Sequence, residues 1–214
     1  MSVMPQAVLR MILVPSLITL AVTLLRLAGE LRGWSEVLFR RSAGGFGAVV
    51  GITWLAFVFA IYFAFKLGRV GDVPVRPARS ILLAILALVL TFSGLNVMYY
   101  GAPNTKPLFQ ATGAVVILIA LYFMRSAWPS YSRILMAYAI ASRVPVIAIM
   151  YLAMRGDWGT HYDAIPPDVS YPDWPTKFIQ AGLIPQVFLW IPFTVILCGL
   201  FGMIALALLR RRDA

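Results

Sequence analysis

The stretch that decides the fold is residues 80–100, which read SILLAILALVLTFSGLNVMYY. It carries no charged side chain, and it is as long as the roughly 20 residues that an α-helix needs to cross the core of a bilayer. Further apolar runs of similar length alternate with short polar or basic connections along the chain. The sequence therefore predicts an all-α, polytopic membrane protein.

The composition of the 214-residue chain favours the same class. Hydrophobic residues make up 61% of it and charged residues 12%, whereas charged residues make up about 25% of a soluble domain. The net charge of +10 comes mainly from loops beside the apolar runs, where basic residues set orientation in the membrane. We therefore expect the lipid bilayer as the surroundings of the chain and no nucleic-acid partner.

Six apolar runs are predicted to span the membrane as one bundle, so that residues 1–214 form a single domain. A loop rich in aromatic residues and proline connects the last two spans, a composition that suits the membrane interface. The predicted spans are 8–29, 46–65, 80–100, 108–124, 132–154 and 183–209, and the loop covers residues 155–182.

The basic loops predict the orientation of this bundle. With six spans both termini lie on one side, and that side carries the arginines at 210–212 and the basic loop at 66–79. Because Lys and Arg accumulate in cytoplasmic loops, we expect cytoplasmic termini and an external loop 155–182. The expected location is a bacterial plasma (inner) membrane.

Polar side chains inside the spans are the candidates for function. On the first span, steps of three and four residues predict one polar face, formed by Ser16, Thr19, Thr23, Arg26 and Glu30. Arg26 and Glu30 are four residues apart, so they can form an ion pair. This face serves either as an interfacial anchor or as the wall of a cavity.

Arg143 is the ionisable residue predicted to lie deepest in the membrane. An arginine at that depth requires a carboxylate, carbonyl groups or water as partner. Pro145 frees the carbonyl of Ala141, so a structural role and a ligand-binding role both remain open. The candidate ligand-binding residues, all expected in the outer half of the bundle, are Arg26, Glu30, Asn96, Tyr100, Ser142 and Arg143.

Small residues at the start of the second predicted span suggest close helix packing. Ala43, Gly47 and Gly51 are spaced by four residues, a pattern that lets another helix approach within the protein or in a homo- or hetero-oligomer.

Motifs of known chemistry match only in fragments. Arg69 and Arg76-Pro77 resemble the first element of membrane phosphatidic-acid phosphatases, and Ser142-Arg143 resembles the start of another element. The nucleophilic histidine of that family would follow Arg143 by six residues, but Ile149 stands there. The single histidine excludes a haem held by two histidines. Asp157, His161 and Asp163 are loosely spaced and make weak candidates for a metal site. We expect no cofactor, no metal and no catalytic residue.

The sequence leaves three functions open. The first is a non-enzymatic membrane protein that binds an anionic small molecule, a lipid headgroup or a partner helix through the outer-half polar residues. The second is a transporter or channel for a small solute or ion, because an intramembrane arginine beside a proline also suits a gate. The third is a membrane-embedded enzyme that modifies lipids.

Overall fold

The computed structural model describes residues 5–43, 49–100 and 106–210. These residues form helices and their connections and contain no strand, which confirms the all-α class. In chain order the elements are α1 (Pro5–Leu31), α2 (Thr53–Arg69), α3 (Pro77–Tyr99), α4 (Lys106–Ala127), α5 (Pro129–Gly156), α6 (Trp174–Lys177), the π-helices η1 (Phe178–Leu183), η2 (Gln186–Trp190) and η3 (Phe193–Cys198), and α7 (Gly199–Arg210).

Five helical stretches in the described ranges are long and apolar enough to cross a membrane. They are Gln6–Leu31, Pro77–Tyr99, Lys106–Ala127, Pro129–Gly156 and the continuous stretch Trp174–Arg210. The remaining predicted span corresponds to α2, which has 17 residues. At about 1.5 Å per residue α2 is roughly 26 Å long, shorter than a bilayer core of about 30 Å.

The start of α2 corrects a prediction from the sequence. The second span was expected to begin at residue 46, but α2 begins at Thr53, so Ala43 and Gly51 precede it and cannot form a packing stripe on it. Gly47 lies outside the described residues. The physical reason is the density of glycine before residue 52, because glycine loses more backbone entropy than other residues when it becomes helical.

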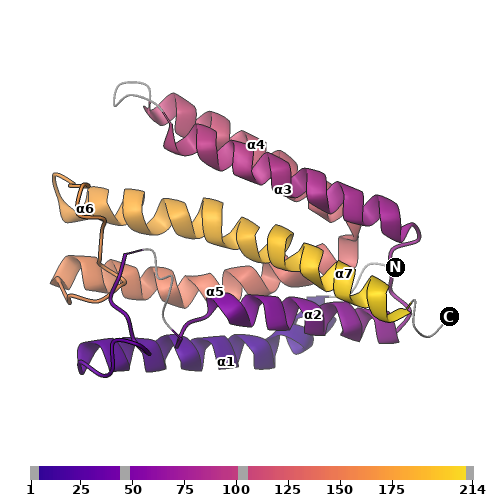
Figure 1. Cartoon of the computed structure of the whole chain (residues 1–214), viewed down its shortest axis with the longest axis horizontal. Coiled ribbons are helices and arrows are strands. Elements are labelled where there is room, and N and C mark those ends of the chain that lie inside the picture. The colour runs from indigo at the N-terminus through magenta and orange to yellow at the C-terminus, as the bar shows by residue number, and fades with distance from the viewer. Residues whose placement is uncertain (1–4, 44–48, 101–105, 211–214) are drawn as a thin grey trace.

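The helices lie side by side with both described ends of the chain at the same end of the bundle (Figure 1). We call this the termini end, and the opposite end, which carries α6, the α6 end. α2 begins about midway along the bundle and runs to the termini end. α3 and α4 form a hairpin that packs closely together and diverges from the other helices towards the α6 end.

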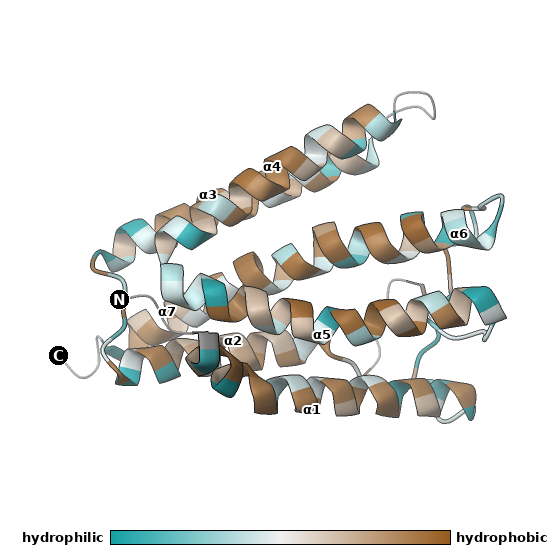
Figure 2. Cartoon of the chain, turned by 180° about the vertical axis from the view of Figure 1, so that it is seen from behind, coloured by the Kyte–Doolittle hydropathy of each residue, from teal (hydrophilic) through white to brown (hydrophobic). Residues whose placement is uncertain are grey.

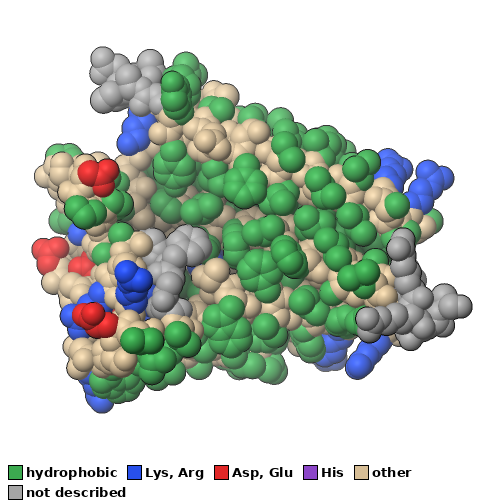
Figure 3. All heavy atoms as spheres, viewed as in Figure 1, with side chains coloured by type: hydrophobic (Ala, Val, Ile, Leu, Met, Phe, Trp, Pro, Cys, Tyr) green, Lys and Arg blue, Asp and Glu red, His purple; other side chains and the backbone are tan. Residues whose placement is uncertain are grey.

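The surface is apolar along the helices and polar at the two ends. Figure 2 shows the most hydrophilic residues near the helix ends, and Figure 3 shows hydrophobic side chains across the middle of the visible face. Many large hydrophobic side chains are exposed, among them Leu82, Leu118 and Ile140. A soluble domain would expose such a surface at a high cost, so these side chains are expected to face lipid. The chain therefore has the features of an integral membrane protein.

Candidate functional site

A cavity of about 540 Å³ occupies the half of the bundle towards the α6 end. Its wall comes from α1, the segment before α2, the ends of α3 and α4, α5, the loop after α5, η1 and η2. The late start of α2 contributes to this location, because the non-helical residues Gly51 and Ile52 and the first residue of α2, Thr53, line the cavity. Non-helical backbone at such a depth is tolerated where it lines a cavity.

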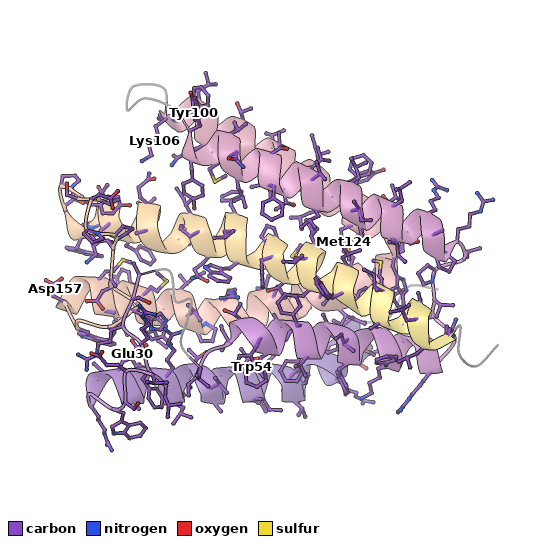
Figure 4. The ribbon with its side chains drawn as sticks, viewed as in Figure 1. Glu30, Trp54, Tyr100, Lys106, Met124 and Asp157 are labelled. Carbon is purple, nitrogen blue, oxygen red and sulfur yellow. The ribbon has the colours of Figure 1, made fainter. Side chains whose placement is uncertain are left out.

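The described residues around this cavity carry positive charge without a carboxylate among them. The basic side chains in its wall belong to Arg26, Lys106 and Arg143, and His161 also lines it. Lys106 lies at the α6 end of the α3–α4 hairpin (Figure 4). Arg26 is paired with Glu30 and Lys106 is exposed, so the buried charge of Arg143 is the one that favours an anion inside the cavity.

Arg143 lies at the middle of the 28-residue helix α5 and is only 5% exposed. Its Nη1 is 3.5 Å from Oε1 of Gln186, which is a weak hydrogen bond, and its guanidinium lies 4.8 Å from the centre of the Trp190 ring. Its buried Nε has no hydrogen-bond partner. Within the described ranges no carboxylate pairs with this charge.

This environment argues against a purely structural role for Arg143. An intramembrane arginine costs about 3 kcal/mol on insertion scales unless it is compensated. Among the described residues, no backbone carbonyl accepts a hydrogen bond from its Nε, and its Nη1 has only the weak hydrogen bond to Gln186. A group that accepts from Nε would remove an unsatisfied buried donor, which is worth about 1–3 kcal/mol.

The other charged candidates form a buried cluster at the edge of the cavity. The Glu30 carboxylate is 1% exposed and accepts hydrogen bonds from Arg26 Nε at 2.8 Å, from the His161 backbone N–H at 2.8 Å and from His161 Nδ1, 2.6 Å away. Arg26 Nη2 also donates to the backbone carbonyl of Arg40 at 3.0 Å. Glu30 thus ties α1 to the loop after α5 and neutralises Arg26 (Figure 4 labels Glu30).

The polar face predicted on the first span is confirmed for four of its five residues; the fifth, Ser16, is half-buried, and its hydroxyl has no hydrogen-bond partner among the described residues. Thr19, Thr23, Arg26 and Glu30 are all buried. The Thr19 hydroxyl is 2.8 Å from the Tyr138 hydroxyl on α5, and the Tyr162 hydroxyl donates to the Thr23 carbonyl at 3.1 Å. Lipid offers no hydrogen-bond partner to such groups, so this face turns into the protein.

Two of the loop residues that were weak candidates for a metal site form other contacts: Asp163 binds backbone N–H groups, and His161 binds Glu30. Asp163 accepts from the N–H groups of Gly159 and Thr160 at 2.9 and 2.7 Å, which closes a tight turn. His161 is held by Glu30, and burial lowers the pKa of His161 below its ordinary value, although the hydrogen bond to Glu30 acts in the opposite direction. Asp157 is exposed and ends α5 in the left-handed conformation.

Three predicted ligand-binding residues lie away from the cavity. Asn96 is exposed and donates to the Phe92 carbonyl of its own helix at 2.8 Å. Tyr100 is 74% exposed, and its ring lies 6.2 Å from that of Phe109 at an angle of 57°. Ser142 is buried but donates to the Tyr138 carbonyl one turn earlier at 2.8 Å. The spacing of polar residues showed which helices are polar but not which way these three side chains point.

Several cavity residues were not singled out by their sequence pattern. Gln186 and Trp190 contact Arg143, and the Gln110 side chain donates to that of Gln180 at 2.8 Å, linking α4 to η1. One signal was available, because Gln186 is a polar residue directly after Pro185 in a predicted span. Its partner on α5 is 43 positions away in sequence and could not be found from spacing.

The rest of the wall is apolar. It includes Val146 and Met150 on α5 and Ala181, Pro185 and Leu189 in the π-helical stretch. Cavities of this size with a few convergent polar groups are typical of small-molecule sites. Comparisons of the chain with protein-family models, with curated proteins and with solved structures give no match.

Proposed function

We propose that this chain is a non-enzymatic integral membrane protein that binds an anionic small molecule or lipid headgroup in the cavity beside Arg143. The observation that carries the proposal is the buried, carboxylate-free guanidinium of Arg143, whose Nε lacks a partner and which lines a cavity large enough for a ligand. An anionic oxygen accepting from Nε would offset the cost of this charge.

The role of Arg26 in the proposal follows from its ion pair. Glu30 compensates its charge, so Arg26 contributes a polar wall and holds the loop in place. Arg143 supplies the recognition of negative charge, and Lys106 adds long-range attraction at the α6 end.

Transport of the same ligand is the second candidate, and the helix Trp174–Arg210 favours it. This helix contains three π-helical segments together with Pro185 and Pro192. The first two π-helical segments, η1 and η2, line the cavity. Local departures from α-helical hydrogen bonding often occur at functional sites and at the broken helices of transporters. Uptake of the bound ligand into sealed vesicles would distinguish transport from binding alone.

The test of binding uses two variants of Arg143. The protein is purified in native lipid nanodiscs, co-purifying molecules are quantified by mass spectrometry, and the thermal midpoint is measured. We expect Arg143→Leu to lose a co-purifying anion while its thermal midpoint stays equal or rises, because a costly buried charge is removed. Arg143→Lys should restore binding only in part, since lysine lacks the planar fork of donors.

The matched control is Arg125→Leu, because Arg125 is an exposed arginine near the other end of α4. It should keep the co-purifying anion. The proposal fails if Arg143→Leu retains the wild-type set of co-purifying molecules, or if it loses them only in proportion to the loss of folded protein.

A further inference from the structure

The N-terminus of α2 opens into the same cavity as Arg143. Gly51, Ile52 and Thr53 all line the cavity, and α2 begins at Thr53. The first N–H groups of an α-helix have no partner within the helix, and they carry partial positive charge. Ile52, at the N-cap, provides no side-chain cap, and the first turn of α2 contains no acidic residue. This end of the helix is therefore suited to an anion.

Arg143 provides an independent observation at the same place. Its guanidinium is nine-tenths buried and lines the cavity, and its Nε has no hydrogen-bond partner. Gln186 and Trp190 hold the other parts of the guanidinium. The cavity thus presents two kinds of donor that no described carboxylate satisfies.

The number of donors favours a phosphate group over a carboxylate. A phosphate monoester has three terminal oxygens, enough to accept from the backbone N–H groups of α2 and from Arg143 together. A carboxylate has only two. The volume of about 540 Å³ far exceeds a lone phosphate, and the adjoining wall at Val146, Met150 and Leu189 is apolar.

We infer that the ligand is an amphiphile with a phosphate group, bound between the α2 N-terminus and Arg143, with its hydrocarbon part along this apolar wall. The inference rests on the proposed anion-binding function and adds the chemical class and the position of the ligand. Burial of the hydrocarbon part against the apolar wall is favourable, so the amphiphile should bind more tightly than inorganic phosphate.

The test compares three probes on the full chain in phosphatidylcholine nanodiscs: octyl phosphate, inorganic phosphate and octyl trimethylammonium. Binding is measured as a saturable rise in the thermal midpoint. We expect octyl phosphate to bind at a concentration at least tenfold below that of inorganic phosphate, and the cation to have no effect. Equal binding of the two phosphates would show a site for the free anion and overturn the amphiphile.

Two variants of Thr53 test the position of the phosphate. In Thr53→Asp a carboxylate enters the first turn of α2, where it stabilises the helix dipole but repels an anion. We expect at least a tenfold weaker binding of octyl phosphate and an equal or higher thermal midpoint without ligand. Thr53→Asn carries no charge and should bind octyl phosphate at least tenfold more tightly than Thr53→Asp; equal binding by the two variants would show that the charge at this position does not matter.

The outcomes separate this inference from the proposed function. If Thr53→Asp binds octyl phosphate normally while Arg143→Leu does not, the position at α2 is wrong and anion binding by Arg143 stands. If no phosphate probe binds although Arg143→Leu loses its co-purifying anion, the ligand class is wrong. If Arg143→Leu changes nothing in either experiment, both proposals fall.

Discussion

At the scale of residues, the carboxylate of Glu30 connects the polar groups near the α6 end of the bundle. Glu30 accepts hydrogen bonds from Arg26 and twice from His161, so a buried charge is both paired and saturated with donors. Because the carboxylate accepts, the neutral His161 ring carries its proton on Nδ1. The loop after α5 is thereby fixed over the cavity by a single side chain of α1.

The protonation of His161 should make the stability of the fold depend on pH. Burial lowers its pKa in the folded protein, while the unfolded chain keeps a value of about 6.5. The unfolded state therefore binds a proton first as the pH falls. We expect stability to be full above about pH 6.5 and to decline below it, by at most about 1.4 kcal/mol per pH unit. Thermal midpoints between pH 7.5 and 5.5 measure this decline.

The control for this prediction is His161→Gln. His161 is the only histidine in the chain, and glutamine can still donate a hydrogen bond to Glu30. Arg26, Glu30 and Asp163 are the charged groups acting on the ring, and all three remain in this variant. Its thermal midpoint should be nearly constant over the same range. A decline as steep as in the wild type would contradict the role of His161.

At the scale of elements, small residues pack α3 against α4. The buried positions of α3 are Ser80, Ala84, Ala87, Thr91, Gly94 and Met98, and those of α4 are Gly113, Ile117, Ala120, Met124 and Ala127. Both sets follow steps of three and four, as in the close helix pairs of membrane proteins. A side-chain carbon added at Gly94 would lie 2.9 Å from the Gly113 carbonyl oxygen.

Gly113→Leu should disrupt this helix pair. An added carbon at Gly113 would meet the Gly94 carbonyl oxygen and lie 2.8 Å from the Met98 nitrogen, and backbone atoms cannot rotate away. We expect a loss of about 1–3 kcal/mol in the free energy of unfolding. Ala111→Leu, on the exposed face of the same helix, is the control. The contact is not essential if both variants melt at the same temperature in detergent.

At the scale of the whole molecule, both described chain ends lie at the same end of the bundle (Figure 1). The basic residues of α2 and α7 near this end include Lys66, Arg69 and Arg210. In Figure 3 the acidic side chains visible on that face lie at the α6 end. On the positive-inside principle we propose that the termini end is cytoplasmic.

Cysteine labelling tests this orientation. Val75 is 97% exposed in the loop between α2 and α3, and Asp168 is exposed in the loop after α5. The native Cys198 is buried and gives no background. A membrane-impermeant thiol reagent should label Asp168→Cys in intact cells and Val75→Cys only after the membrane is opened. The reverse pattern would show that the bundle is inverted.

Much of the architecture follows from the sequence by itself. A segment such as 80–100 has few alternatives to a membrane helix, because backbone groups in lipid must pair within the segment. The polar face of the first span and the depth of Arg143 follow from helix periodicity and length. The spacing of small residues in α3 and α4 also indicates that these two helices pack closely, whereas the sequence prediction placed close packing at the glycines before α2.

The location and the lining of the cavity follow only from the tertiary structure. Its location depends on where α2 begins, and glycine-rich sequence does not state whether a helix starts at residue 46 or at Thr53. Arg143 contacts Gln186 in its wall, and Glu30 contacts His161 at its edge; these pairs are 43 and 131 positions apart in sequence. Helix periodicity defines the faces of each helix, but which faces meet depends on the packing of all helices together.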